Sequence, residues 1–186
     1  AGVRGQILVR GDSAYGNSTV VAACRRAGAR FSLVLTKNRT VAAAIDAIDE
    51  DAWTPVKYPG AVRDPDTGAW ISDAEVAEIG FTAFASTPHA VTARLIVRRV
   101  KDARYRDALF PVWRFHPFFT DTDEPVDAAD ITHRRHAIIE TVFADLIYGP
   151  LAHMPDVIFS SVVARPVDLL RCVVVSVVDA AVNRVR

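Results

Sequence analysis

The sequence is poor in cysteine and has no excess of charge of either sign. Its two cysteines, Cys24 and Cys172, lie far apart and form no CxxC pair, so neither a disulfide framework nor a zinc ribbon is indicated. We expect both thiols to be buried. The 22 basic residues are balanced by 22 acidic ones. The total charge therefore gives no support for a nucleic-acid partner, because phosphate neutralisation usually needs a basic excess.

A membrane-spanning segment and a signal peptide are also missing. The longest apolar stretch, Val167 to Val182, is interrupted by three charges that are costly in lipid, at Asp168, Arg171 and Asp179. We interpret this stretch as a buried helix that begins after Pro166. The first residues include neither a methionine nor a charged and apolar signal region. They fit a chain that begins inside a longer cytoplasmic protein.

The N-terminal part of the chain has the pattern of a β-α-β unit. Residues 6–10 and 30–36 are short apolar runs typical of buried strands. Asn17 or Ser18 can cap a helix between them, and Gly28 can supply its left-handed exit. Asp12 then lies at the carboxyl end of the first strand. Parallel strands in such units bind ligands outside their carboxyl ends, so an acidic residue there is well placed for chemistry.

The middle of the chain changes from helical to β-rich spacing. Residues 39–48 are alanine-rich and predict a helix, whereas residues 51–113 are dense in short alternating runs and turn residues. Residues 64–68 predict a hairpin turn. The alternation over residues 91–98 predicts a half-buried strand with a basic outer face, and residues 115–120 predict another strand.

Helical spacing returns from Asp130 and brings three polar side chains to one face. His133, His136 and Glu140 follow one another at i, i+3 and i+7, so they can converge on one point. The simplest interpretation is the solvated edge of a helix. A second hypothesis is a hydrolase in which these residues bind a single Zn²⁺, although the spacing is not HExxH and no general base is evident.

Several segments resemble one family of enzymes in the same order along the chain. Residues 3–15 resemble the strand that carries the second aspartate of bacterial insertion-sequence DDE transposases, and residues 133–155 resemble the helix that carries their glutamate. The β insertion found in one branch of that family is similar to three further segments, at residues 51–60, 70–78 and 91–100. The resemblance therefore covers nearly the whole chain.

This resemblance implies an α/β fold with an RNase H-like mixed sheet and flanking helices. Residues 1–50 and 114–186 would form the catalytic domain without its first strands, and residues 51–113 would form an inserted antiparallel β module. Asp12 and Glu140 would be two of the three carboxylates that hold two Mg²⁺ or Mn²⁺ ions. These ions activate the nucleophile and stabilise the leaving oxygen during attack on a DNA phosphodiester.

The resemblance also implies the partners of the protein. The DNA partners would be the terminal repeats of the element and its target, and the full-length protein would form a homodimer in the bacterial cytoplasm. The family signature on this helix is Tyr, Arg, Glu and Lys. This chain has His133, His136, Glu140 and Ile147 in those places, so the glutamate is kept and the other three residues differ. Histidine can still donate a hydrogen bond to phosphate. Ile147 cannot replace the lysine, so we expect weaker binding of the DNA ends or a degenerate copy, unless Arg134 or Arg135 compensates for the lost phosphate contact.

The first catalytic aspartate of the family has no equivalent before Asp12. We therefore expect this fragment to be inactive by itself, and an inert transposase remnant is a further hypothesis. Arg94 and Arg98 belong to the densest basic stretch and are candidate contacts of the DNA backbone. An ordinary charged hairpin is the alternative. A tryptophan of the insertion could stack on a flipped base, but core packing is the simpler interpretation for Trp53, Trp70 and Trp113.

Overall fold

The chain begins with the β-α-β unit that its sequence predicts. A computed structural model describes residues 5–105, 107–135 and 174–178. Strand β1 (Gln6–Gly11) is parallel to β2 (Arg30–Val34), and helix α1 (Ser18–Arg26) connects them. The Asn17 side chain caps α1 by accepting a hydrogen bond from the Val20 amide at 3.1 Å. Gly28 leaves the helix with a φ of 66°. The two strands, the helix between them, its cap at Asn17 and its exit at Gly28 are therefore confirmed.

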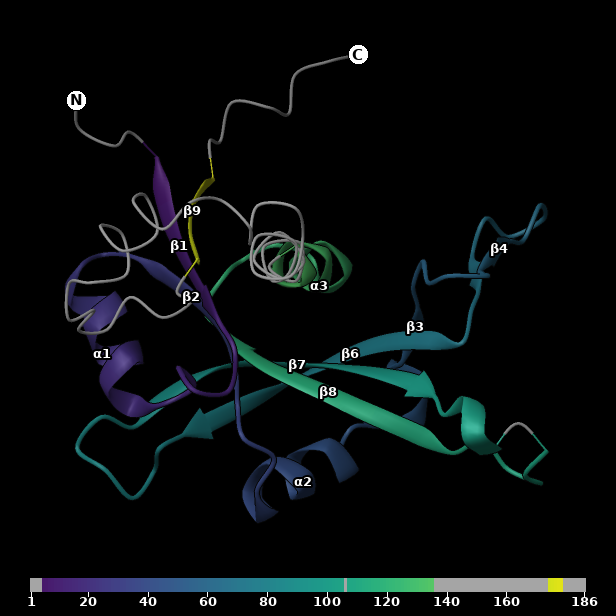
Figure 1. Cartoon of the computed structure of the whole chain (residues 1–186), viewed down its shortest axis with the longest axis horizontal. Helices are drawn as coiled ribbons and strands as arrows, with labels where there is room; N and C mark the ends of the chain where they lie inside the picture. Colours follow the sequence, from purple (N-terminus) through teal and green to yellow (C-terminus); the bar gives the residue numbers. More distant parts are fainter. Residues whose placement is uncertain (1–4, 106, 136–173, 179–186) are drawn as a thin grey trace, which may run out of the picture.

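The protein is built on one mixed sheet with helices on its faces (Figure 1). In the described part of the chain the sheet has seven strands in the order β3-β6-β7-β8-β2-β1-β9, and among these only β1 and β2 are paired in parallel. The α/β class is therefore confirmed. The remaining elements are α2 (Arg39–Asp46), β3 (Thr54–Pro55), β4 (Val62–Arg63), β5 (Trp70–Ile71), β6 (Ala74–Ala83), β7 (Val91–Lys101), β8 (Trp113–Thr120), α3 (Val126–Arg134) and β9 (Val174–Val178).

The β-rich stretch at residues 51–113 adds its long strands to the same sheet. Strands β6 and β7 form an antiparallel hairpin, and β7 pairs along its length with β8, which pairs in turn with β2. The short strands β4 and β5 form a separate two-stranded sheet. They enclose the predicted turn, where Gly68 has a φ of 68°. The stretch thus continues the sheet that starts with β1 and β2.

The main hydrophobic core lies on the sheet face covered by α1 and α2. Its centre consists of side chains that are fully buried, among them Phe31, Leu33 and Phe119. Burial of each such side chain stabilises the fold by roughly 1.5–3 kcal/mol. The Cys24 thiol is also buried in this core, as predicted. Cys172 lies outside the described residues.

Helix α3 covers the opposite face of the sheet (Figure 1) and corrects one prediction. Ile96 and Phe118 pack there against Ala129 of the helix. Ile96 is 0% exposed and Arg98 is 3% exposed. The basic outer face predicted for residues 91–98 is therefore wrong at Ile96 and Arg98, because β7 is a central strand and α3 shields this part of it from solvent.

The predicted helix at residues 167–182 is wrong over residues 174–178. These residues form β9, which pairs antiparallel with β1 from Gln6↔Val178 to Arg10↔Val174. Four of the five residues of β9 are valines, whose branched Cβ favours strands. The edge of β1 supplies hydrogen-bonding partners for the backbone of β9. None of the helices described in the structure is both long and apolar enough to span a membrane.

Candidate functional site

Asp12 lies at the edge of the sheet where the carboxyl ends of two parallel strands meet. It directly follows β1, and its neighbour β2 ends at Val34. One carboxylate oxygen of Asp12 accepts a hydrogen bond from the Ala14 amide at 2.9 Å, and its carbonyl oxygen accepts one from the Tyr15 amide at 3.1 Å. This turn holds a partly exposed carboxylate just beyond the strand. The sequence-based placement of Asp12 at a strand end is confirmed.

The last turn of α3 reaches the same two strands. Arg10 of β1 donates a hydrogen bond through Nη1 to the carbonyl oxygen of Thr132 at 2.6 Å. Ser32 of β2 is hydrogen-bonded through Oγ to Nδ1 of His133 at 2.8 Å. Because these contacts involve adjacent strands, they fix the end of α3 over the strands that lead to Asp12. His136 and Glu140, which follow α3 in the sequence, lie outside the described residues.

A buried ion pair anchors α3 to the middle of the sheet. Arg98 of β7 binds the Asp130 carboxylate through two hydrogen bonds, from Nη2 to Oδ2 at 2.6 Å and from Nε to Oδ1 at 3.2 Å. Their side chains are 4% and 2% exposed. The bidentate geometry satisfies both charges in a place where an unpaired charge would be costly. Arg98 therefore stabilises the interior of the protein by binding Asp130. The predicted contact of Arg98 with the DNA backbone is incompatible with this burial.

Arg94, the other arginine predicted to contact DNA, also binds groups of the protein. Its Nε donates to Glu78 at 2.7 Å, and its Nη1 donates to the carbonyl oxygens of Thr122 and Glu124 at 2.6 and 2.8 Å. Arg94 thus ties β7 to β6 and to the loop that precedes α3. These contacts engage most of the donors that a phosphate would need.

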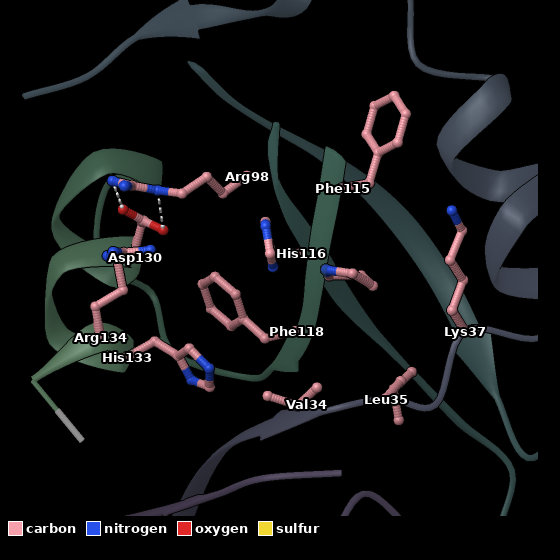
Figure 2. Close-up of a pocket in the computed structure, with 11 residues that line it drawn as sticks. Val34, Leu35, Lys37, Arg98, Phe115, His116, Phe118, Asp130, His133 and Arg134 are labelled. Atoms are coloured by element: carbon pink, nitrogen blue, oxygen red, sulfur yellow. Dashed lines mark hydrogen bonds and ion pairs between the residues drawn. The ribbon is translucent and has the colours of Figure 1, made fainter. Parts of the chain in front are cut away.

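A pocket of about 420 Å³ opens between α3, β8 and the end of β2 (Figure 2). The pairing of β2 with β8 ends at Val34↔Phe118, whereas β8 extends back to Trp113 beside β7. The early end of β2 leaves a notch beside the first half of β8, which α3 borders on one side. The pocket is lined by Val34, Leu35, Lys37, Arg98, Phe115, His116, Pro117, Phe118, Asp130, His133 and Arg134.

The positive charge of the arginines around this pocket affects its titratable groups. The His116 ring lines the pocket, where part of its surface is exposed and part is covered by neighbouring residues. Burial among its neighbours lowers the pKa of His116, and the charges of Arg114, Arg134 and Arg98 lower it further. Burial and the nearby Arg98 likewise lower the pKa of Arg134. Burial is the larger cause of both shifts, and the contribution of the three arginines to the His116 shift reflects the positive charge near α3, because nearby positive charge disfavours a further proton.

His133 has a defined place in the wall of the pocket. Its ring stacks on Phe118 with the ring centres 4.1 Å apart and an angle of 2° between the planes. The contact with Ser32 orients the ring further. His133 and Arg134, which the sequence analysis names as possible DNA contacts, both line this pocket beside the end of β2.

The packing interpretation explains two of the three tryptophans. Trp53 and Trp113 enclose the guanidinium of Arg99, which lies 4.3 and 4.4 Å from the two ring centres. Glu50 and Glu75 neutralise the same guanidinium through ion pairs. Two aromatic faces and two carboxylates thus hold one buried cation. Neither ring is free on both sides to stack on a base.

Comparison with known proteins leaves the family of the chain open. No protein-family model matches the sequence, and no curated protein matches it. Over residues 5–105, 107–135 and 174–178, no group of three or more His, Cys, Asp or Glu side chains is placed to hold a metal ion. The zinc hypothesis needs two residues beyond these ranges, His136 and Glu140, and it stays a hypothesis.

Sequence reasoning missed three residues that build the pocket. Asp130 has the pattern of a solvated helix residue, and no sequence signal pairs it with Arg98, which lies 32 positions earlier. Lys37 belongs to a connection between elements. His116 alternates with apolar residues like any outward residue of a strand. Only the meeting of β2, β8 and α3 brings these residues together.

Proposed function

We propose that this chain belongs to a DDE transposase and forms part of its RNase H-like catalytic domain. The observation that carries the proposal is the arrangement around Asp12. This carboxylate follows β1 at the carboxyl edge of the sheet, and α3, which precedes Glu140 in the sequence, ends over β1 and β2. The contacts of Arg10 and Ser32 thus bring the segment before Glu140 close to the strands that carry Asp12.

The types of residue at this edge fit divalent cations. Mg²⁺ and Mn²⁺ prefer oxygen ligands, and the partly exposed Asp12 carboxylate supplies them from a rigid strand end. Asp12 and Glu140 would hold the ions together with a third carboxylate. When bound, two such ions activate the attacking water or 3′-hydroxyl group and stabilise the leaving oxygen of a DNA phosphodiester. The two side chains would orient the ions and thereby the scissile phosphate.

The DNA-binding residues of the proposal follow from the exposure of each cation. Arg134 borders an open pocket and can reach a phosphate, and His133 lies in the same wall. We retain His136 as a candidate from its place in the sequence. Arg98 is buried against Asp130, so we assign it to the stability of the fold. In the complete protein we expect a homodimer that binds the terminal repeats of the element and a target DNA.

The test is strand cleavage by the complete encoded protein. The substrate is a DNA duplex that carries the inverted repeats flanking the gene, and the reaction contains Mg²⁺ or Mn²⁺. We expect Asp12→Asn and Glu140→Gln each to abolish cleavage, because either change removes a charged metal ligand. The matched control is Asp46→Asn, which removes an exposed carboxylate at the end of α2. Full cleavage by Asp12→Asn, or cleavage that persists in EDTA, would refute the proposal.

A further inference from the structure

The pocket beside α3 carries positive charge at two separated places (Figure 2). Arg134 extends from α3, and Lys37 lies across the pocket, in the connection between β2 and α2. Neither side chain forms an ion pair with a carboxylate of the described residues. Among the described residues that line the pocket, the single acidic one, Asp130, is neutralised by its two hydrogen bonds from Arg98. The remaining charge of the lining is therefore positive.

Between the two cations the wall of the pocket is largely apolar and aromatic. Phe115, Pro117, Val34 and Leu35 contribute to it. The ammonium group of Lys37 lies 5.5 Å from the centre of the Phe115 ring. A site for a simple inorganic anion would need no such wall. Basic groups that alternate with aromatic and apolar surface are typical of sites that follow a single nucleic-acid strand.

We propose that this pocket binds a short stretch of single-stranded DNA. The backbone phosphates contact Arg134 with His116 at one end and Lys37 at the other, and a sugar and base contact the wall around Phe115. A pocket of about 420 Å³ falls in the size range of small-ligand sites, roughly 300–1,000 Å³, and can take in part of a strand. The choice of DNA as the ligand rests on the proposed function. The charge and shape of the pocket are observed independently of that function.

The experiment measures binding of a fluorescent hexathymidylate to the 186-residue chain in EDTA. Because metal is absent, binding does not depend on the catalytic carboxylates. For single strands, each phosphate contact contributes about −0.7 to the slope of log affinity against log salt concentration. We expect Arg134→Gln and Lys37→Gln each to reduce the steepness of this slope by about 0.7. Each should also weaken binding at low salt about ten-fold, since a hydrogen bond to a charged group is lost.

The control variant is Arg26→Gln, which removes an exposed arginine from the last turn of α1, on the other side of the sheet. It should leave both the slope and the affinity unchanged, and circular dichroism should show that every variant is folded. Inorganic phosphate is the second probe. The proposal is overturned if Arg26→Gln weakens binding as much as the two pocket variants. It is also overturned if phosphate binds as tightly as the oligonucleotide, which would indicate an anion site only.

The oligonucleotide assay and the cleavage assay can fail separately. Binding that is lost in Lys37→Gln but kept in Asp12→Asn supports the pocket whatever the cleavage assay shows. Cleavage without hexathymidylate binding would support the proposed function and refute the pocket. The His116 ring provides a direct signal, because its NMR resonances should shift when the oligonucleotide is added to the parent chain and shift less in Arg134→Gln.

Discussion

Replacing Asp130 by alanine tests whether its ion pair with Arg98 anchors α3 to the sheet. Both side chains are almost fully buried, and the two hydrogen bonds between them measure 2.6 and 3.2 Å. Removal of the carboxylate leaves the guanidinium without its counterion in an interior from which water is excluded. Breaking such a buried pair costs about 3–5 kcal/mol. For a chain of this length we expect the melting temperature to fall by roughly 10 °C.

The assay is urea unfolding followed by tryptophan fluorescence and circular dichroism. The matched control is Glu78→Ala, which breaks the more exposed pair with Arg94. Since exposed pairs contribute about 0–1 kcal/mol, the control should lose much less stability. The double variant Arg98→Met with Asp130→Leu should recover most of the loss, because an apolar pair of similar volume can replace a buried ion pair. A loss below about 1 kcal/mol in Asp130→Ala would refute this reasoning.

Two further predictions concern a close backbone contact at Gly16 and the carboxylate of Asp102. In Gly16→Ala the added Cβ would overlap the carbonyl oxygen of Val34, so we expect thermal unfolding to show a loss of about 1–3 kcal/mol. Gly80→Ala meets no atom within 4 Å and is the control; equal melting temperatures would contradict the prediction. Hydrogen bonds from Arg104 lower the pKa of Asp102 to about 2. The stability from this carboxylate is therefore complete above its ordinary pKa of 3.8 and is lost as the pH falls through about 2. Carboxyl NMR titration of Arg104→Gln should show the pKa of Asp102 rising toward its ordinary value, and an unchanged pKa would argue against this cause.

Local structure was predictable where short-range chemistry determines it. The cap at Asn17, the left-handed exit at Gly28 and the turn that ends at Gly68 depend on neighbouring residues alone, and all three are confirmed. The strands of the β-α-β unit were also recognisable, because a buried strand needs a continuous apolar run. The position of Asp12 at a strand end followed directly from these elements.

Tertiary structure alone decided which side chains were buried and which residues met. The alternation in β7 is the same whether one face meets solvent or a helix, so the sequence could not show that α3 covers Arg98. The valine run at Val174–Val178 became a strand because the edge of β1 was open to it. The candidate site has the same origin. By itself the sequence determined the cap of α1, its left-handed exit and the turn at Gly68, whereas the ion pair at Asp130 and the pocket depend on contacts between distant segments, which no local pattern contains.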